Sequence, residues 1–275
     1  MILLGTSGFS YTDWKGRFYP ERLGARDMLA YYARRFPACE INATYYRIPA
    51  PAQTAAMLRK AGPSLVFVAK AHQSMTHHRD AGTSDYAAFA DALRPWREAG
   101  RLGAVLLQYP YAFTNTLEHR GAVVDVRDRL ADLDAPCVVE FRHHSWLRDE
   151  TQAWLAEQAL SMVNVDEPRL RGLMPPTETV TGPVGYVRFH GRNAAHWFRP
   201  REAWQRYDYR YTAEELSEWV PRLRRIDARA RTTFVFFNNH WQSQAVDNAR
   251  DMARLLGVPL PAVGDGGGQT DLDLA

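Results

Sequence analysis

The chain has little cysteine and no long apolar run. Cys39 and Cys137 are the only cysteines among its 275 residues, and both lie in or beside apolar segments where a thiol packs as a small apolar group. No stretch approaches the roughly 20 apolar residues that span a bilayer, and the first residues lack the basic region and cleavage site of a secretion leader. We therefore expect a reduced, cytoplasmic protein with no membrane contact.

Several common sequence motifs are also missing. Gly5 and Gly8 follow the first apolar segment without the third glycine of a dinucleotide fingerprint, and no P-loop is present. Ser7 and Ser145 lack the flanking glycines of a nucleophile elbow. The formal charge of +3 and the pI near 8.9 are too mild to indicate nucleic-acid binding by themselves. Nicotinamide chemistry and serine-triad hydrolysis are therefore disfavoured.

What the chain does have is a repeated pattern of apolar segments that end in polar side chains. Eight short segments read as strands, and each runs into ionisable or amide residues. Representative residues at these ends are Ser7, Asn42, Lys70, Gln108, Arg142, Asp166, His190 and Asn238. If the strands are parallel, these groups meet at one face, which is where parallel α/β folds place their chemistry.

Segments with helical periodicity lie between the predicted strands. They cover residues 27–35, 52–61, 86–99, 118–130, 150–159, 212–226 and 245–256. Eight strands alternating with helices are typical of an α/β protein with a single TIM-like (β/α)8 barrel, and an open doubly wound sheet is the alternative. We assign the barrel to residues 1–257 and a flexible tail to the glycine-rich residues 258–275. Two long connections, 7–23 and 168–183, are expected to cover the barrel rim or to close its other end.

At these strand ends the sequence resembles the YecE-like proteins, also known as domain of unknown function 72 (DUF72). The matching stretches cover residues 5–20, 40–49, 140–146, 187–192 and 236–241, with 165–168 between them. Phe9 stands where that family often carries tryptophan. The resemblance implies a TIM-barrel fold and no established activity, so function must be argued from the site.

The leading functional hypothesis is an enzyme, with hydrolase as the expected class, that acts on a phosphorylated or nucleic-acid-like anion. The cations Lys70, Arg142, Arg188 and Arg192 suit an anion, and Asn238 and Asn239 add neutral donors. Acid, base or metal-binding roles are assigned to Glu140, Asp166 and His190. Further substrate contacts are expected from Tyr11, Trp14, Glu40 and Asn42.

Three other interpretations stay open. Glu40 or Glu140 with Asp166 would suit a glycoside hydrolase, provided that the carboxylates lie roughly 5–10 Å apart. Aromatic and arginine residues that alternate over 192–210 would suit a non-catalytic protein that binds a nucleotide or RNA. Alternatively, the charged residues form internal ion pairs, since buried charges are costly unless paired. A divalent metal is considered but not favoured, because no tight ligand spacing is present, and sequence does not decide the oligomeric state.

Overall fold

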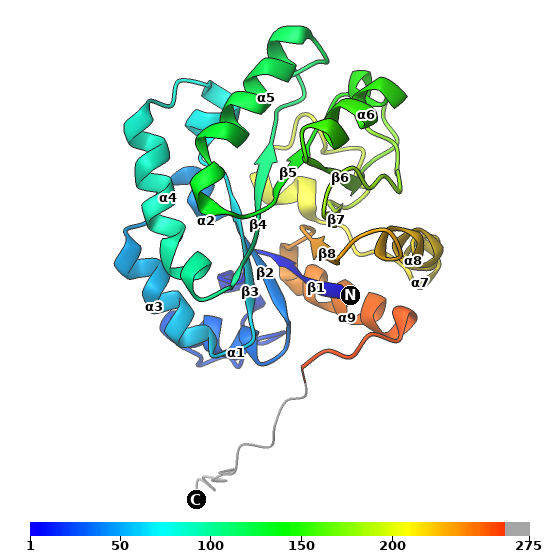
Figure 1. Cartoon of the computed structure of the whole chain (residues 1–275). Helices are drawn as coiled ribbons and strands as arrows, with labels where there is room; N and C mark the ends of the chain where they lie inside the picture. The colour runs from blue at the N-terminus through cyan, green and yellow to red at the C-terminus, as the bar shows by residue number, and fades with distance from the viewer. Residues whose placement is uncertain (262–275) are drawn as a thin grey trace, which may run out of the picture.

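The computed structural model describes residues 1–261, and in them the sheet is a closed barrel of eight parallel strands (Figure 1). The strands follow one another around the barrel in chain order, and β8 pairs with β1, with Gly5 opposite Phe236. This closure confirms the predicted (β/α)8 barrel and excludes the open sheet. The strands are β1 Ile2–Ser7, β2 Ala38–Ile41, β3 Val66–Lys70, β4 Leu102–Gln108, β5 Cys137–Glu140, β6 Ser161–Asp166, β7 Val184–Phe189 and β8 Thr232–Phe237.

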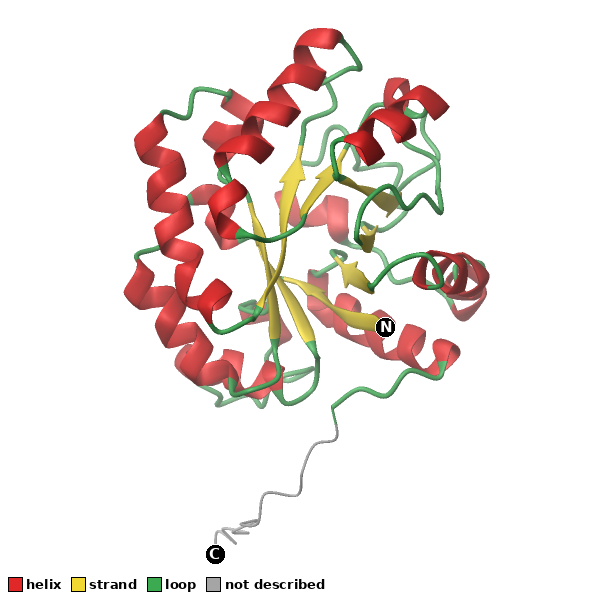
Figure 2. Ribbon diagram, viewed as in Figure 1, coloured by secondary structure: helices red, strands yellow, loops and turns green. Residues whose placement is uncertain are grey.

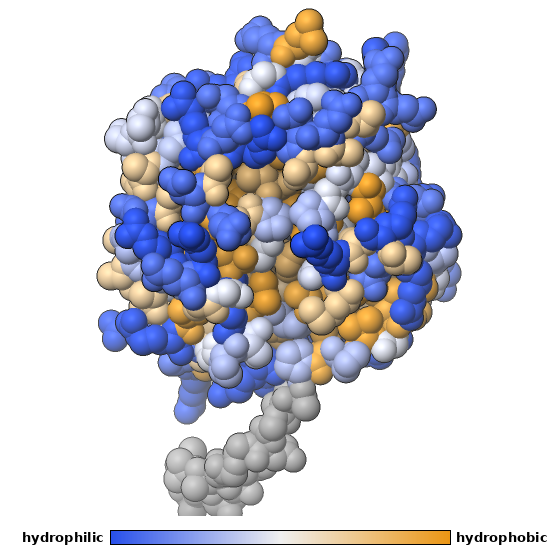
Figure 3. Space-filling view, in the orientation of Figure 1, coloured by the Kyte–Doolittle hydropathy of each residue, from blue (hydrophilic) through white to orange (hydrophobic). Residues whose placement is uncertain are grey.

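Helices surround the barrel, as Figure 2 shows in red around the yellow strands. In the space-filling view, apolar residues lie between patches of hydrophilic side chains over the outer helices (Figure 3). None of the helices in residues 1–261 combines the length and the apolar character that crossing a membrane requires. The helices are α1 Met28–Ala33, α2 Ala43–Tyr46, α3 Pro51–Ala61, α4 Thr83–Glu98, α5 Leu117–Arg129, α6 Asp149–Glu157, α7 Ala213–Ser217, α8 Val220–Asp227 and α9 Gln244–Leu256.

The single helix predicted over residues 212–226 is wrong, because two helices occupy this segment. Its predicted start is confirmed: Thr212 Oγ1 accepts from the Glu215 N–H, and Glu215 Oε2 accepts from the Thr212 N–H. Pro221 lies in the first turn of α8. Because proline has no N–H, it cannot continue the hydrogen bonding of the preceding helix, and α7 ends at Ser217.

The interior of the barrel is apolar towards the start of the strands and charged towards their ends. Gly103 faces this interior, where a Cβ atom would lie 2.6 Å from the Phe234 ring and 2.7 Å from Val66. A larger side chain would therefore collide with the rings that fill the barrel. Nearer the strand ends the buried interior residues include Glu40, Glu140 and Arg188, which is an unusual content for a layer that apolar side chains normally fill.

The two long connections both lie against the ends of strands. In the first, the Trp14 Nε1–H donates to the His240 carbonyl at 2.7 Å, which ties the connection after β1 to the one after β8. In the second, Thr177 and Thr179 hydrogen-bond to Asn164 of β6. Both cysteines are buried free thiols, as expected. Of the predicted tail, residues 262–275 lie outside the described residues, whereas Val258 and Leu260 pack against the core.

Candidate functional site

Arg188 of β7 joins two carboxylates from opposite parts of the barrel. Its two terminal nitrogens lie 2.7 Å from Glu40 Oε1 and 2.5 Å from Glu140 Oε2. The Tyr186 hydroxyl donates to the other Glu40 oxygen at 2.6 Å. Arg188 is 2% exposed, and both carboxylates are fully buried. Side chains from β2, β5 and β7 thus meet inside the barrel, although they are far apart in sequence.

Arg142 extends this network from the buried interior towards the surface. Its Nε lies 2.6 Å from Glu140 Oε1, and its Nη1 donates to Glu167 Oε2 at 2.8 Å. The other Glu167 oxygen accepts from the Met174 N–H at 3.2 Å. We call this set the Glu140 cluster: Glu40, Glu140, Arg142, Glu167 and Arg188.

His190 completes the buried side of the Glu140 cluster. Its Nε2 lies 3.5 Å from Glu140 Oε1, and its Nδ1 lies 3.1 Å from Asn238 Nδ2. Because the Asn238 amide nitrogen is a donor, Nδ1 accepts, and the neutral ring carries its proton on Nε2. Burial, with Arg142 nearby, lowers the pKa of His190 to about 3. Among the described residues, neither His190 Nε2 nor Arg188 Nε has a hydrogen-bond partner of regular geometry.

The two carboxylates next to Arg142 differ in their acidity. Burial opposes ionisation of Glu140, but Arg142 and Arg188 outweigh it and hold the pKa well below its usual value. Glu167 has only one arginine partner, so burial dominates and raises its pKa to about 7. Glu140 is therefore a fixed negative charge, while Glu167 can take up or release a proton near neutral pH.

Lys70, at the end of β3, lies beside the Glu140 cluster. Its Nζ donates to Gln108 Oε1 at 2.8 Å and lies 4.1 Å from the centre of the Tyr45 ring. Burial, followed by the positive charge of Arg188, lowers the pKa of Lys70 to about 7. A substantial fraction of this amine is therefore neutral at physiological pH.

A cavity of about 270 Å³ opens at the rim, next to Gln108 and Arg142. We call it the rim cavity. Phe198 is 52% exposed and Tyr111 39% exposed at this rim, and their rings pack edge to face. The cavity is lined by His77, Gln108, Pro110, Tyr111, Arg142, Leu173, Trp197, Phe198, Arg206 and Tyr207.

The lining of the rim cavity is cationic and aromatic. The guanidinium carbons of Arg142 and Arg206 lie 5.6 and 6.0 Å from the Trp197 ring centre, and Arg206 Nε donates to the Trp197 carbonyl at 2.7 Å. None of the described residues lining the cavity is an aspartate or a glutamate. The cavity therefore suits an anion that also carries a flat ring.

His77 lines the same cavity from an irregular segment. It belongs to a π-helical turn, Ser74–His78, that ends at Arg79 with φ 57°. Its ring packs edge to face on Tyr45, with centres 4.9 Å apart. Burial, followed by the charge of Lys70, lowers the pKa of His77 to about 4. His77 is thus a neutral imidazole at pH 7, able to donate or accept a hydrogen bond.

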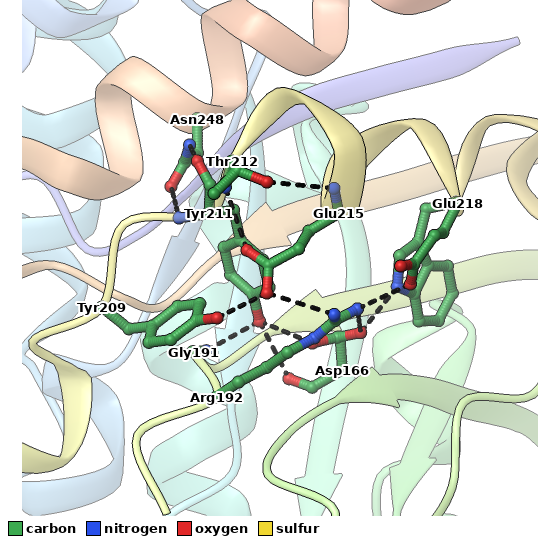
Figure 4. Close-up of polar contacts among 10 residues, drawn as sticks. Asp166, Gly191, Arg192, Tyr209, Tyr211, Thr212, Glu215, Glu218 and Asn248 are labelled. Carbon is green, nitrogen blue, oxygen red and sulfur yellow. Dashed lines mark hydrogen bonds and ion pairs between the residues drawn. The ribbon is translucent and has the colours of Figure 1, made fainter.

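Asp166 and Arg192 lie in a separate cluster (Figure 4). Arg192 binds both Asp166 oxygens at 2.8 Å. The Tyr211 hydroxyl donates to Oδ1 at 2.8 Å, and the Trp219 Nε1–H donates to Oδ2 at 2.7 Å. Arg192 also lies 3.2 Å from Glu215 and from Glu218. We call this set the Asp166 cluster: Asp166, Arg192, Tyr211, Glu215, Glu218 and Trp219.

Other predicted site residues have structural contacts. Tyr11 donates to the Ser7 carbonyl at 2.7 Å and stacks on His240, while Trp14 is fully buried. Asn239 donates to the Tyr209 carbonyl and to Asn248. Asn42 precedes α2, and its buried Oδ1 has no hydrogen-bond partner among the described residues.

The structure therefore brings only part of the predicted site together. Glu40, Glu140, Arg142, Arg188 and His190 form one network, with Lys70 and Asn238 beside it. Of all the predicted residues, Arg142 alone lines the rim cavity in the described part of the chain. Of the other lining residues, Gln108 ends β4, and the rest lie in the connections after β3, β4, β6 and β7. Alternation of arginine with aromatic residues over 192–210 was the available signal for Trp197, Arg206 and Tyr207.

Within residues 1–261, no group of three or more histidine, cysteine, aspartate or glutamate side chains is arranged to hold a metal ion. The carboxylates of the Glu140 cluster are instead within 3 Å of arginine nitrogens. The candidate metal-binding roles of Glu140, Asp166 and His190 therefore receive no support from this arrangement.

Comparison with known proteins identifies relatives over nearly the whole chain. Residues 3–267 match the family described as protein of unknown function DUF72. The UPF0759 protein YunF of Bacillus subtilis (strain 168) is 29% identical, over 94% of this chain and 95% of that protein.

Solved structures agree with this match. A DUF72 family protein from Thermotoga maritima MSB8 is 37% identical, with a TM-score of 0.83 over 94% of this chain and 99% of that one. A DUF72 family protein from Enterococcus faecalis V583 is 27% identical, with a TM-score of 0.83 over 94% and 96%. A xylose isomerase domain containing protein from Salmonella typhimurium LT2 shares the fold at 12% identity and a TM-score of 0.51.

Proposed function

The chain belongs to the DUF72 family, and we propose that it is an enzyme that binds a phosphorylated, ring-bearing small molecule in the rim cavity. The observation that carries this proposal is the lining of the cavity, where Arg142 and Arg206 flank Trp197 and no carboxylate lies among the described lining residues. Guanidinium groups bind phosphate oxygens through parallel hydrogen bonds. Trp197 itself is buried, but the exposed rings of Tyr111 and Phe198 at the rim can stack on a sugar or a base.

The groups beneath the cavity support turnover rather than binding alone. Lys70 and Glu167 both have a pKa of about 7, and they contact the lining residues Gln108 and Arg142. Groups that exchange protons near the working pH are the ones that general acid and base catalysis needs. The fixed charges of Glu140 and Arg188 set the electrostatic field in which these groups titrate.

A binding test can be made with matched pairs of ligands. Adenosine 5′-phosphate and ribose 5-phosphate are titrated against adenosine and ribose, with calorimetry as the readout. We expect the phosphorylated member of at least one pair to bind more tightly. Arg206→Gln should weaken that binding by about tenfold or more, because a hydrogen bond to a charged group contributes about 1.5–3 kcal/mol.

Arg201→Gln is the matched control, since Arg201 is exposed on the same connection and does not line the cavity. It should leave the affinity unchanged. Equal affinity of wild type and Arg206→Gln, or no preference for phosphate in any pair, would contradict the proposal.

A second candidate function is non-catalytic binding of a nucleotide or a single-stranded RNA. The exposed rings of Tyr111 and Phe198 at the rim favour it, because such rings stack on unpaired bases. This candidate predicts binding that weakens with salt but no conversion of the bound ligand. Product analysis by mass spectrometry after prolonged incubation separates it from the enzyme.

A glycoside hydrolase receives less support. Glu40 and Glu140 are both bound to Arg188 and are fully buried, and Asp166 accepts hydrogen bonds on both oxygens from within its own cluster. A sugar at the rim cavity would not meet a pair of carboxylates there.

A further inference from the structure

The chain uses lysine very rarely. Lys15, Lys60 and Lys70 are its only lysines, which leaves 31 arginines among the 34 basic Lys and Arg residues. Lys60 is exposed, Lys15 is half-buried in the first long connection, and Lys70 lies at the end of a barrel strand. In a chain that supplies nearly all its positive charge as arginine, the cation at this strand end is a lysine.

Lysine can do one thing at this position that arginine cannot. Its amine can lose a proton and expose a lone pair, whereas a guanidinium stays charged in proteins. A residue that only pairs with a carboxylate does not need to lose a proton, so an arginine is sufficient, as Arg142 and Arg188 show. A neutral amine at a strand end beside a cavity is the requirement for nucleophilic attack by nitrogen.

The surroundings of Lys70 favour the neutral form of its amine and orient it. Thr44 Oγ1 donates to the Lys70 carbonyl at 2.6 Å and fixes the strand end. Gln108 is held by its own bond from Nε2 to the Tyr109 carbonyl at 2.7 Å, so its Oε1 faces the Lys70 Nζ. One amine hydrogen is thereby engaged, and the lone pair stays available. Burial disfavours protonation of Lys70 most strongly, followed by the charge of Arg188, while Glu140 and Glu40 favour it.

Lys70 also lies directly behind the cavity wall. Gln108, its hydrogen-bond partner, and His77, whose ring contacts Tyr45 beside it, both line the rim cavity. A ligand anchored by Arg142 and Arg206 would therefore place its uncharged end towards Gln108 and Lys70.

From this arrangement we propose that Lys70 forms an imine with the carbonyl carbon of a phosphorylated aldehyde or ketone bound in the rim cavity. This inference rests on the proposed function, because the phosphate site orients the substrate. The Lys70 nitrogen attacks the carbonyl carbon, and a C–N bond forms. The carbonyl oxygen takes up two protons and leaves as water. The nitrogen loses its two protons, and a C=N bond remains. The step consumes no oxidant or reductant, and water reverses it.

Trapping with borohydride tests this directly. The full chain is incubated with pyridoxal 5′-phosphate, a phosphorylated aromatic aldehyde used here as a probe, and the imine is reduced with sodium borohydride. Peptide mass mapping then locates the secondary amine among three lysines and the N-terminus. We expect Lys70 to be modified at least about ten times faster than the exposed Lys60, with a rate that rises with pH and levels off above about pH 7, the pKa of Lys70.

Variants and a second probe separate this inference from the proposed function. Lys70→Arg should abolish the adduct and retain phosphate-dependent binding, and Arg206→Gln should slow modification of Lys70. Pyridoxal without its phosphate should react with Lys70 more slowly. Modification of Lys60 or Lys15 as fast as Lys70 would overturn the imine inference.

Two mixed results remain distinguishable. Phosphate-dependent, Arg206-dependent binding without an adduct on Lys70 removes the imine and leaves the proposed function standing. Fast modification of Lys70 that is indifferent to phosphate and to Arg206→Gln supports a reactive Lys70 but contradicts the anion site.

Discussion

The Glu140 cluster and the Asp166 cluster are both built on ion pairs, but they differ in how completely their polar groups are hydrogen-bonded. Both join carboxylates to arginines at the ends of neighbouring strands. In the Asp166 cluster each Asp166 oxygen accepts two hydrogen bonds, and the outer partners Glu215 and Glu218 are 19% and 59% exposed. This cluster joins the connection after β7 to the end of β6. Both oxygens of the Asp166 carboxylate are fully hydrogen-bonded without a ligand.

The Glu140 cluster is incomplete in ways that the Asp166 cluster is not. Among the described residues, Arg188 Nε has no hydrogen-bond partner. The neighbouring His190 Nε2 lies 3.5 Å from Glu140 Oε1 without regular hydrogen-bond geometry, and Glu167 has a pKa near the working pH. Its three carboxylates face two arginines and Lys70, so charge balances whether Lys70 and Glu167 are both ionised or both neutral. What identifies the site is therefore unsatisfied and titratable groups next to a cavity, rather than charge at a strand end.

The largest contrast is expected when the central arginine of each cluster is removed. Arg188→Met leaves Glu40 and Glu140 buried without their shared partner, which should destabilise the fold by about 3–5 kcal/mol. Urea unfolding followed by circular dichroism gives the free energy of unfolding. A loss below about 1 kcal/mol would show that the two carboxylates are relieved by protonation instead, and the network would not be a fixed ion cluster.

The second contrast is the pH dependence of the free energy of unfolding, and it is expected to come from Glu167. Its pKa is about 7 in the folded chain against an ordinary value of 4.5. The folded state thus binds the proton more tightly, so this stabilisation is complete below pH 4.5 and is lost as pH rises through 7. At about 1.4 kcal/mol per pKa unit, the loss is roughly 3 kcal/mol.

Glu167→Gln removes this titration and supplies the reference. The amide nitrogen of glutamine cannot accept from Arg142, and this loss adds a pH-independent contribution to the difference in unfolding free energy between wild type and variant. We expect that difference to change by roughly 3 kcal/mol between pH 4.5 and 8, because only the wild type titrates at this position. If that difference stays constant over the whole range, Glu167 does not titrate near neutrality, and the electrostatic contrast between the clusters disappears.

Sequence predicted the barrel well because its signals are local and repeated. Each apolar segment and each helical period is a property of neighbouring residues, and eight repetitions leave few architectures. The same reasoning located Glu140, Arg188 and His190 at one rim. Pro221, which interrupts the helix predicted over 212–226, is a local signal of the same kind, because proline cannot continue a helix.

The partition of the charged residues into two clusters was not predictable in this way. Asp166 and Glu140 both end strands, and only the tertiary partners distinguish them: Tyr211 and Trp219 for one, Arg188 and His190 for the other. The cavity is equally non-local, since Tyr111, Trp197 and Arg206 come from connections whose course depends on packing. Residues in such loops carry no periodicity that a sequence can show.

The smallest effect is expected from Arg192→Met, which tests whether the Asp166 cluster is purely structural. Asp166 keeps its bonds from Tyr211 and Trp219, Glu215 keeps its bond from the Tyr209 hydroxyl, and Glu218 is exposed, so the loss should be about 1–3 kcal/mol. Phosphate-dependent binding should be unchanged once the protein is folded, and modification of Lys70 should proceed at the wild-type rate. Calorimetry at a temperature well below the unfolding transition checks this. A selective loss of affinity with stability preserved would place Arg192 in the binding site and remove the distinction between the two clusters.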